Sequence, residues 1–215
     1  MRIQTVAVLI LLTTAAGCSK SQSQPTSTAA APAATAPAAA PKASTTVSGR
    51  VPGVVPGATA FVWLEPKPAR EFPPSPEKPV MDQVGQTFGP SLLFVRTGQP
   101  VEFRNSDDTL HNVHVTNEDT REGAFNVAIP TGSSYDYTFK QDGFYHVGCD
   151  IHPAMSAEIV STSTPYATTA DADGSYVFED VQPGTYVLTT MVEGRRTQKE
   201  MTVTAPQSPG TPSRE

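Results

Sequence analysis

The stretch GFYHVGCDIHPAM, residues 143–155, decides how this part of the chain folds. Its first half alternates, with Tyr145 and Cys149 on one face, which is typical of a strand buried on one side. The loop that follows carries His152 and Met155 back toward the end of that strand. A thiol, an imidazole and a thioether are therefore expected to meet at one strand end.

The chain beyond residue 46 has the same β-like character throughout. Short apolar runs are separated by Gly, Pro, Asn and Asp, and no apolar periodicity of about 3.6 residues appears after residue 17. Strands this short and this evenly punctuated predict an all-β chain built of antiparallel sandwiches. The predicted strands are 47–51, 60–64, 91–95, 100–104, 112–116, 135–139, 143–147, 157–160, 176–179, 184–190 and 199–204.

The N-terminus has the character of an export signal. Arg2 precedes the apolar run 6–12, which is too short to span a bilayer, and small residues lead to Cys18. This arrangement resembles a bacterial lipobox, so residues 1–17 are expected to be a lipoprotein signal peptide and Cys18 to receive lipid. The protein would then be anchored to a membrane on the periplasmic side of the cell envelope. The alternative is ordinary signal cleavage, which would leave Cys18 as a free thiol.

Residues 18–46 are rich in Ala, Pro, Ser and Thr, with few bulky apolar side chains. Such a segment buries too little surface to offset the entropy of ordering, so it is predicted to be a disordered tether. Residues 206–215 are predicted to be a polar tail.

Composition excludes several classes of function. The chain of 215 residues has a formal net charge of −6 and no basic block, which argues against a nucleic-acid partner. The sequence contains no glycine-rich nucleotide-binding pattern and no Ser/His/Asp hydrolase signature. If Cys18 carries lipid, Cys149 is the only remaining thiol. A lone thiol in an oxidising compartment is expected to be buried or to hold a metal.

The histidines cluster around this thiol. Every histidine of the chain lies in the segment that also contains Cys149 and Met155. One thiolate, two imidazoles and a thioether suit a copper electron-transfer site, because soft sulfur stabilises Cu(I) and a weak axial Met tunes the potential. Zinc rarely accepts a thioether, which argues against it. The four histidines are His111, His114, His146 and His152.

Strand alternation separates His111 from His114. The two lie three residues apart, so in a strand they face opposite sides. Val113 and Val115 share the face of His111 and are expected to be core. His111 is therefore the predicted ligand, whereas His114 and, by the same alternation, His146 are expected to be exposed.

Three motifs resemble the plastocyanin and amicyanin branch of the cupredoxins, over about residues 81–160. They are Phe103-x-Asn105-x-Asp107, His111-Asn112-Val113-His114 and Cys149-x-x-His152-Pro153-x-Met155. The short gap between His152 and Met155 is similar to the amicyanin loop.

The resemblance implies one type 1 (blue) copper per chain. His111, Cys149, His152 and the axial Met155 would be its ligands, and Asn112 would tie the two ligand loops together by hydrogen bonds. The sequence departs from the family at Asp150, where Ser or Thr is common.

A second resemblance covers the C-terminal part. Residues 166–178 and 181–188 are similar to the carboxypeptidase regulatory-like, transthyretin-like sandwich, and residues 47–51 and 60–64 supply the strands with which such a module begins. We therefore expect a Greek-key cupredoxin sandwich inserted into this smaller one. The alternative is two strands decorating the cupredoxin, followed by a partial module. The expected boundaries are 47–65 for the first strands, 66–80 for a Pro-rich connector, 81–162 for the cupredoxin and 163–205 for the remainder.

The resemblance implies transfer of single electrons, without enzymatic activity. A redox protein (a cytochrome, an oxidase or a dehydrogenase) would dock near His152, and the protein would be a monomer. The whole arrangement also resembles methylamine-utilisation-type cupredoxin-like proteins. Two alternatives remain open: a copper-binding or delivery protein without an electron-transfer role, and a metal-free structural β-sandwich lipoprotein.

Overall fold

The computed structural model describes residues 45–205. Within these residues the regular secondary structure consists of β-strands, and no helix forms. The predicted signal peptide, the lipidated Cys18, the tether up to residue 44 and the tail 206–215 lie outside the described residues. Within residues 45–205, no helix is long and apolar enough to cross a membrane.

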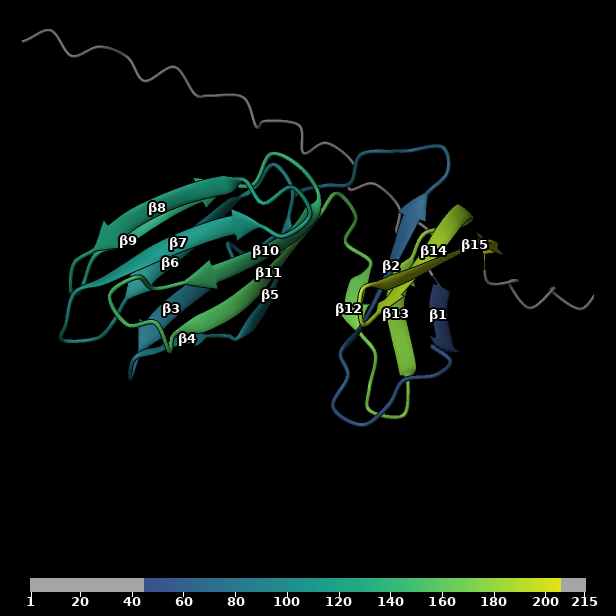
Figure 1. Cartoon of the computed structure of the whole chain (residues 1–215). Coiled ribbons are helices and arrows are strands. Elements are labelled where there is room, and N and C mark those ends of the chain that lie inside the picture. Colours follow the sequence, from purple (N-terminus) through teal and green to yellow (C-terminus); the bar gives the residue numbers. More distant parts are fainter. Residues whose placement is uncertain (1–44, 206–215) are drawn as a thin grey trace, which may run out of the picture. The chain divides into compact units, whose positions relative to one another are not determined.

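The middle of the chain forms a sandwich of two sheets, which we call the first sandwich (Figure 1). One sheet has the strand order β5-β11-β10-β7-β8 and the other β4-β3-β6-β9. The bounds are β3 Val80–Val84, β4 Thr87–Gly89, β5 Leu92–Arg96, β6 Pro100–Asn105, β7 His111–Asn117, β8 Gly123–Ile129, β9 Ser134–Thr138, β10 Gly143–Gly148 and β11 Ser156–Thr162.

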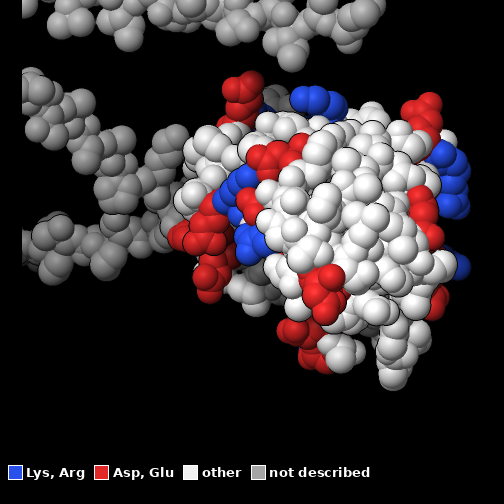
Figure 2. Space-filling view, turned by 90° about the vertical axis from the view of Figure 1, so that its left-hand side faces the viewer, with Lys and Arg blue, Asp and Glu red and all other residues white. Residues whose placement is uncertain are grey.

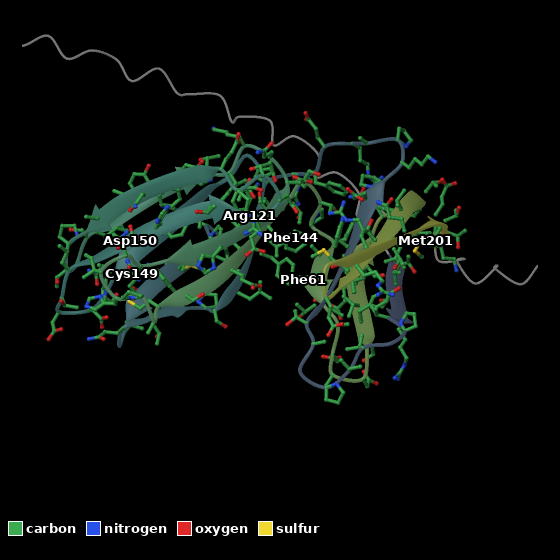
Figure 3. The ribbon with its side chains drawn as sticks, in the orientation of Figure 1. Phe61, Arg121, Phe144, Cys149, Asp150 and Met201 are labelled. Carbon is green, nitrogen blue, oxygen red and sulfur yellow. The ribbon has the colours of Figure 1, made fainter. Side chains whose placement is uncertain are left out.

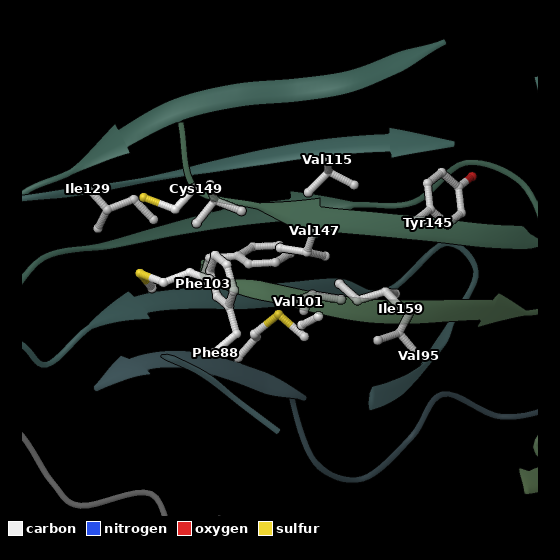
Figure 4. Close-up of a cluster of buried hydrophobic side chains, with 14 of the residues drawn as sticks. Phe88, Val95, Val101, Phe103, Val115, Ile129, Tyr145, Val147, Cys149 and Ile159 are labelled. Atoms are coloured by element: carbon white, nitrogen blue, oxygen red, sulfur yellow. The ribbon is translucent and has the colours of Figure 1, made fainter. Parts of the chain in front are cut away.

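Side chains from both sheets fill the space between them (Figure 4). The four-stranded sheet contributes Phe103 from β6, and the five-stranded sheet contributes Val115, Val147 and Ile159. Each of these four residues is fully buried, because alternate residues of a strand point to the same side. Cys149 belongs to the same cluster, so the core extends up to the ligand loop.

Strands from both sides of this segment form the second sandwich. A two-stranded sheet pairs β1 with β13, and a four-stranded sheet has the order β12-β2-β14-β15. Its core combines Leu64 of β2 with Tyr186 of β14, more than a hundred residues later in the chain. The bounds are β1 Thr45–Arg50, β2 Ala60–Pro66, β12 Ala167–Thr169, β13 Ser175–Val181, β14 Gly184–Val192 and β15 Arg195–Val203.

The predicted all-β fold is confirmed, but its pairing differs from the expectation in one respect. Two pairs in the first sandwich, β3 with β6 and β5 with β11, are parallel, so the prediction of antiparallel pairing does not hold for these two pairs. The cause is that the chain crosses between the two sheets, which makes strands that are not consecutive into neighbours within a sheet.

Candidate metal centre

The candidate site lies at one end of the five-stranded sheet, where two neighbouring inner strands place their ligand residues side by side. Strand β7 begins at His111, and its antiparallel neighbour β10 ends at Gly148, one residue before Cys149. In an antiparallel pair the start of one strand lies beside the end of the other. Figure 3 shows Cys149 and Asp150 at this end of the first sandwich.

Three of the four predicted ligands come together. The Sγ of Cys149 lies 3.9 Å from the Nδ1 of His111 and 3.9 Å from the Nδ1 of His152. The two Nδ1 atoms are 2.9 Å apart, and the three donor atoms all lie within 4.8 Å of one another. Cys149 and His111 are buried, whereas His152 is half-buried. Two nitrogens and one sulfur therefore face a common point at the edge of the core.

Met155, the predicted axial ligand, is buried in the same core cluster as Cys149. Its backbone N–H donates to the carbonyl of His152 (2.9 Å), which closes the loop into a tight turn. Met155 and Cys149 thus belong to one cluster at this end of the core, and both residues line one cavity.

A carboxylate holds the far side of the His111 ring. The Nε2 of His111 lies 2.8 Å from the Oδ2 of Asp107. The N–H of Gln86 donates to the same carboxylate (2.9 Å) and is the main cause of the lowered pKa of Asp107, to which the hydrogen bonds from His111 and Gly85 add. An ionised carboxylate only accepts, so Nε2 carries the proton and Nδ1 keeps a free lone pair. This tautomer is the one that a metal at Nδ1 requires.

Asn112 bridges the two ligand segments. Its Oδ1 accepts from the N–H of Asp150 (2.7 Å) and of Ile151 (3.3 Å), and lies 3.3 Å from the Sγ of Cys149. A side chain next to His111 thus fixes the backbone that follows Cys149, and both donor groups are held in one position relative to each other.

Asp150, which the sequence left unexplained, lies in a dense polar network on the outer face of the sheet. Its carboxylate accepts from Asn112 (3.0 Å) and Asn126 (2.8 Å), and faces the Nδ1 of His114 (3.0 Å). These contacts, with His114 first and Asn126 second, hold the pKa of Asp150 below its ordinary value. Asp150 therefore remains ionised and fixes the amide of Asn112 from the side away from the thiol.

The two histidines predicted to lie outside the site do so. His114 lies on the outer face of β7 with its side chain 42% exposed, and His146 is exposed on β10. The contacts of Asp107 and Asn126 were not predicted from the sequence, in which Asp107 appeared only as part of a motif. The spacing of Asp107 four residues before His111 was the available signal, because a metal-bound imidazole commonly has a carboxylate on its second nitrogen.

One segment of the chain is similar to a known protein family. Residues 79–162 match the sequence model of copper-binding proteins of the plastocyanin/azurin family. No curated protein matches the chain.

Several solved structures are similar to part of this chain. A reduced variant of amicyanin is similar at 24% identity, over 41% of this chain and 85% of its own, with a TM-score of 0.37. A copper-containing nitrite reductase from Thermus scotoductus SA-01 is similar at 30% identity, over 41% of this chain but only 23% of its own, with a TM-score of 0.37. A purple cupredoxin from Nitrosopumilus maritimus is similar at 20% identity, over 40% of this chain and 100% of its own, with a TM-score of 0.35.

Proposed function

We propose that this chain is a type 1 copper protein that transfers single electrons, because residues 79–162 match the sequence model of copper-binding proteins of the plastocyanin/azurin family. His111, Cys149 and His152 would hold one copper ion, with Met155 as its axial ligand. The observation that carries the proposal is the approach of three donor atoms to within 4.8 Å of one another. A bound copper ion would supply the Cu(II)/Cu(I) couple.

The donor set fits a metal in size and in chemistry. For bonds of about 2.0–2.3 Å, as zinc makes to nitrogen and sulfur, the ligand atoms of one ion lie roughly 3.3–3.8 Å apart. Both sulfur–nitrogen separations here, 3.9 Å, are close to this range, and the two nitrogens, 2.9 Å apart, would have to separate by a few tenths of an ångström to hold one ion. A thiolate, two imidazoles and a nearby thioether are the ligands that copper takes in electron-transfer sites.

Hydrogen bonds that hold the ligands in place suit electron transfer. Asp107 holds the Nε2 edge of the His111 ring, and Asn112 holds the backbone after Cys149. Donors fixed in this way move little when the charge of the metal changes, which lowers the energy of reorganisation on electron transfer. Four protein donors leave no coordination position for a substrate, so we propose no catalytic reaction at this site.

The surface next to the ligands suits docking of a redox protein. Leu110 and Ile151, the neighbours of His111 and His152, are 47% and 46% exposed. Figure 2, which looks onto the side where Cys149 lies in Figure 3, shows a wide uncharged area bordered by acidic and basic side chains. We propose that a cytochrome, an oxidase or a dehydrogenase approaches here, because exposed apolar side chains beside a charged rim are typical of a protein interface.

Copper addition tests the proposal. The purified chain is expected to bind one Cu(II) at this site with intense sulfur-to-copper absorption in the visible range, and to lose and regain the colour on reduction and reoxidation. Cys149→Ser should abolish the absorption, since it removes the thiolate. Cys18→Ser is the matched control and should keep it. Colourless, exchangeable Cu(I) binding would instead support copper delivery, and failure to bind copper would support a structural role.

We also propose that the protein is exported and anchored by lipid on Cys18, on the basis of the small residues that precede this cysteine. Mass spectrometry of the mature protein should find an N-terminus at Cys18 carrying acyl chains, and Cys18→Ser should move the protein from the membrane fraction to the soluble fraction. A mature N-terminus without lipid would contradict this proposal.

A further inference from the structure

Two histidines outside the proposed copper site share the outer face of the five-stranded sheet. In the pairing of β7 with β10, His114 lies opposite Gly148, and Thr116 lies opposite His146. Residues directly opposite each other, and residues two apart in one strand, project on the same side of a sheet. The two imidazoles are thus diagonal neighbours on adjacent strands, a separation that long side chains bridge.

A hydrogen bond to Asp150 leaves the Nε2 of His114 available to bind a cation. Its Nδ1 lies 3.0 Å from the carboxylate of Asp150, which two asparagines also hold in place. A carboxylate only accepts hydrogen bonds, so Nδ1 donates and Nε2 is left with a free lone pair in the neutral ring. This contact between carboxylate and imidazole is the one that orients histidine ligands in metal sites generally.

His146 presents a second nitrogen nearby. Its Nε2 lies 3.4 Å from the position that a Cβ on residue 148 would occupy, so the ring lies over Gly148. Gly148 is the residue directly opposite His114, and its missing side chain leaves the space between the two rings open. Among residues 45–205, no hydrogen bond or ion pair engages the imidazole of His146, so both of its nitrogens are open to a ligand from solvent.

A cavity of about 470 Å³ joins these groups. His114, His146, Gly148 and Asp150 line it, together with Cys149 and Met155. We propose that His114 and His146 form a second, solvent-facing site for a divalent transition-metal ion, Cu(II) or Zn(II), with waters completing the coordination. Imidazole nitrogen is a good ligand for both ions. The site would hold metal directly beside the buried ligands.

The inference does not depend on electron transfer, and zinc tests it separately. The mature full chain without a polyhistidine tag is first saturated with copper and freed of excess, and Zn(II) is then titrated by calorimetry. The copper-loaded protein should bind one Zn(II). His114→Gln and His146→Gln should each weaken this binding about tenfold or more, and the double variant should abolish it, while the visible absorption of the first site is retained.

Thr116→Val is the matched control, because Thr116 lines the same cavity, opposite His146, without offering an imidazole. It should leave the zinc affinity within about twofold of the parent. Cys149→Ser should lose the visible absorption but keep the zinc site that depends on the two histidines. The inference is overturned if the copper-loaded chain takes up no Zn(II), or if the double variant binds it like the parent. Zinc binding without any visible absorption in the parent would instead count against the proposed function alone.

Discussion

Replacing Leu64 with alanine is expected to lower the free energy of unfolding of the second sandwich by about 2–5 kcal/mol. Leu64 is fully buried in strand β2, opposite Leu188 of β14, and its N–H donates to the carbonyl of Tyr166 (2.9 Å). The truncation would remove buried apolar surface and leave a cavity between strands that meet from distant parts of the chain. Denaturant unfolding followed by the fluorescence of Trp63, the single tryptophan and a β2 residue, measures it.

Leu110→Ala is the matched control, since it makes the same chemical change at a side chain that is 47% exposed. It should change the free energy of unfolding by no more than about 0.5 kcal/mol. The comparison also decides between the two arrangements expected from the sequence. If Leu64→Ala were as mild as Leu110→Ala, β2 would be a decoration and not part of a core.

Copper is expected to stabilise the first sandwich by about 4 kcal/mol when the free ion exceeds its Kd a thousandfold. The reason is that the folded sandwich gathers His111, Cys149 and His152 within bonding range of one ion, whereas the unfolded chain does not. Thermal or denaturant unfolding with and without copper, followed by far-UV circular dichroism, measures the effect, and a strong chelator should reverse it.

In Cys149→Ser the stabilisation by copper should fall well below that of the parent, because the thiolate is lost. Equal stabilisation of this variant and the parent would show that copper binds elsewhere on the folded chain and would contradict the proposed ligand set.

Alternation alone predicted which residues are buried and which are exposed in much of β7 and β10, the two strands that carry the site. The buried side chains of Val113 and Val115 and the exposed position of His146 were predicted correctly, because a period of two residues leaves no freedom once one face is core. Strand β8 was not predicted. Ala124 and Phe125 are both half-buried, so its sequence shows no clean alternation.

The polar contacts around the site could not be predicted from the sequence in this way. Asp107 is fixed by N–H groups of the turn between β3 and β4, about twenty residues earlier in the chain, and no spacing in the sequence reports that contact. Asp150 stood out only as a departure from a family pattern. Its explanation requires Asn126, on a strand that was not predicted, to lie opposite His114. Such contacts arise from the pairing of strands and not from local sequence.

The interrupted path of the second sandwich gives the two sandwiches unequal dependence on each other. Between the end of β2 at Pro66 and the start of β12 at Ala167 lie roughly a hundred residues, which form a loop that the second sandwich must close. When the first sandwich is folded, only its short connectors remain flexible. Each doubling of a flexible loop costs about 0.6 kcal/mol, so closing a hundred residues costs about 1–2 kcal/mol more than closing roughly twenty. Unfolding of the first sandwich therefore weakens the second by this entropic route alone, whereas the first sandwich has no such loop to close across the second.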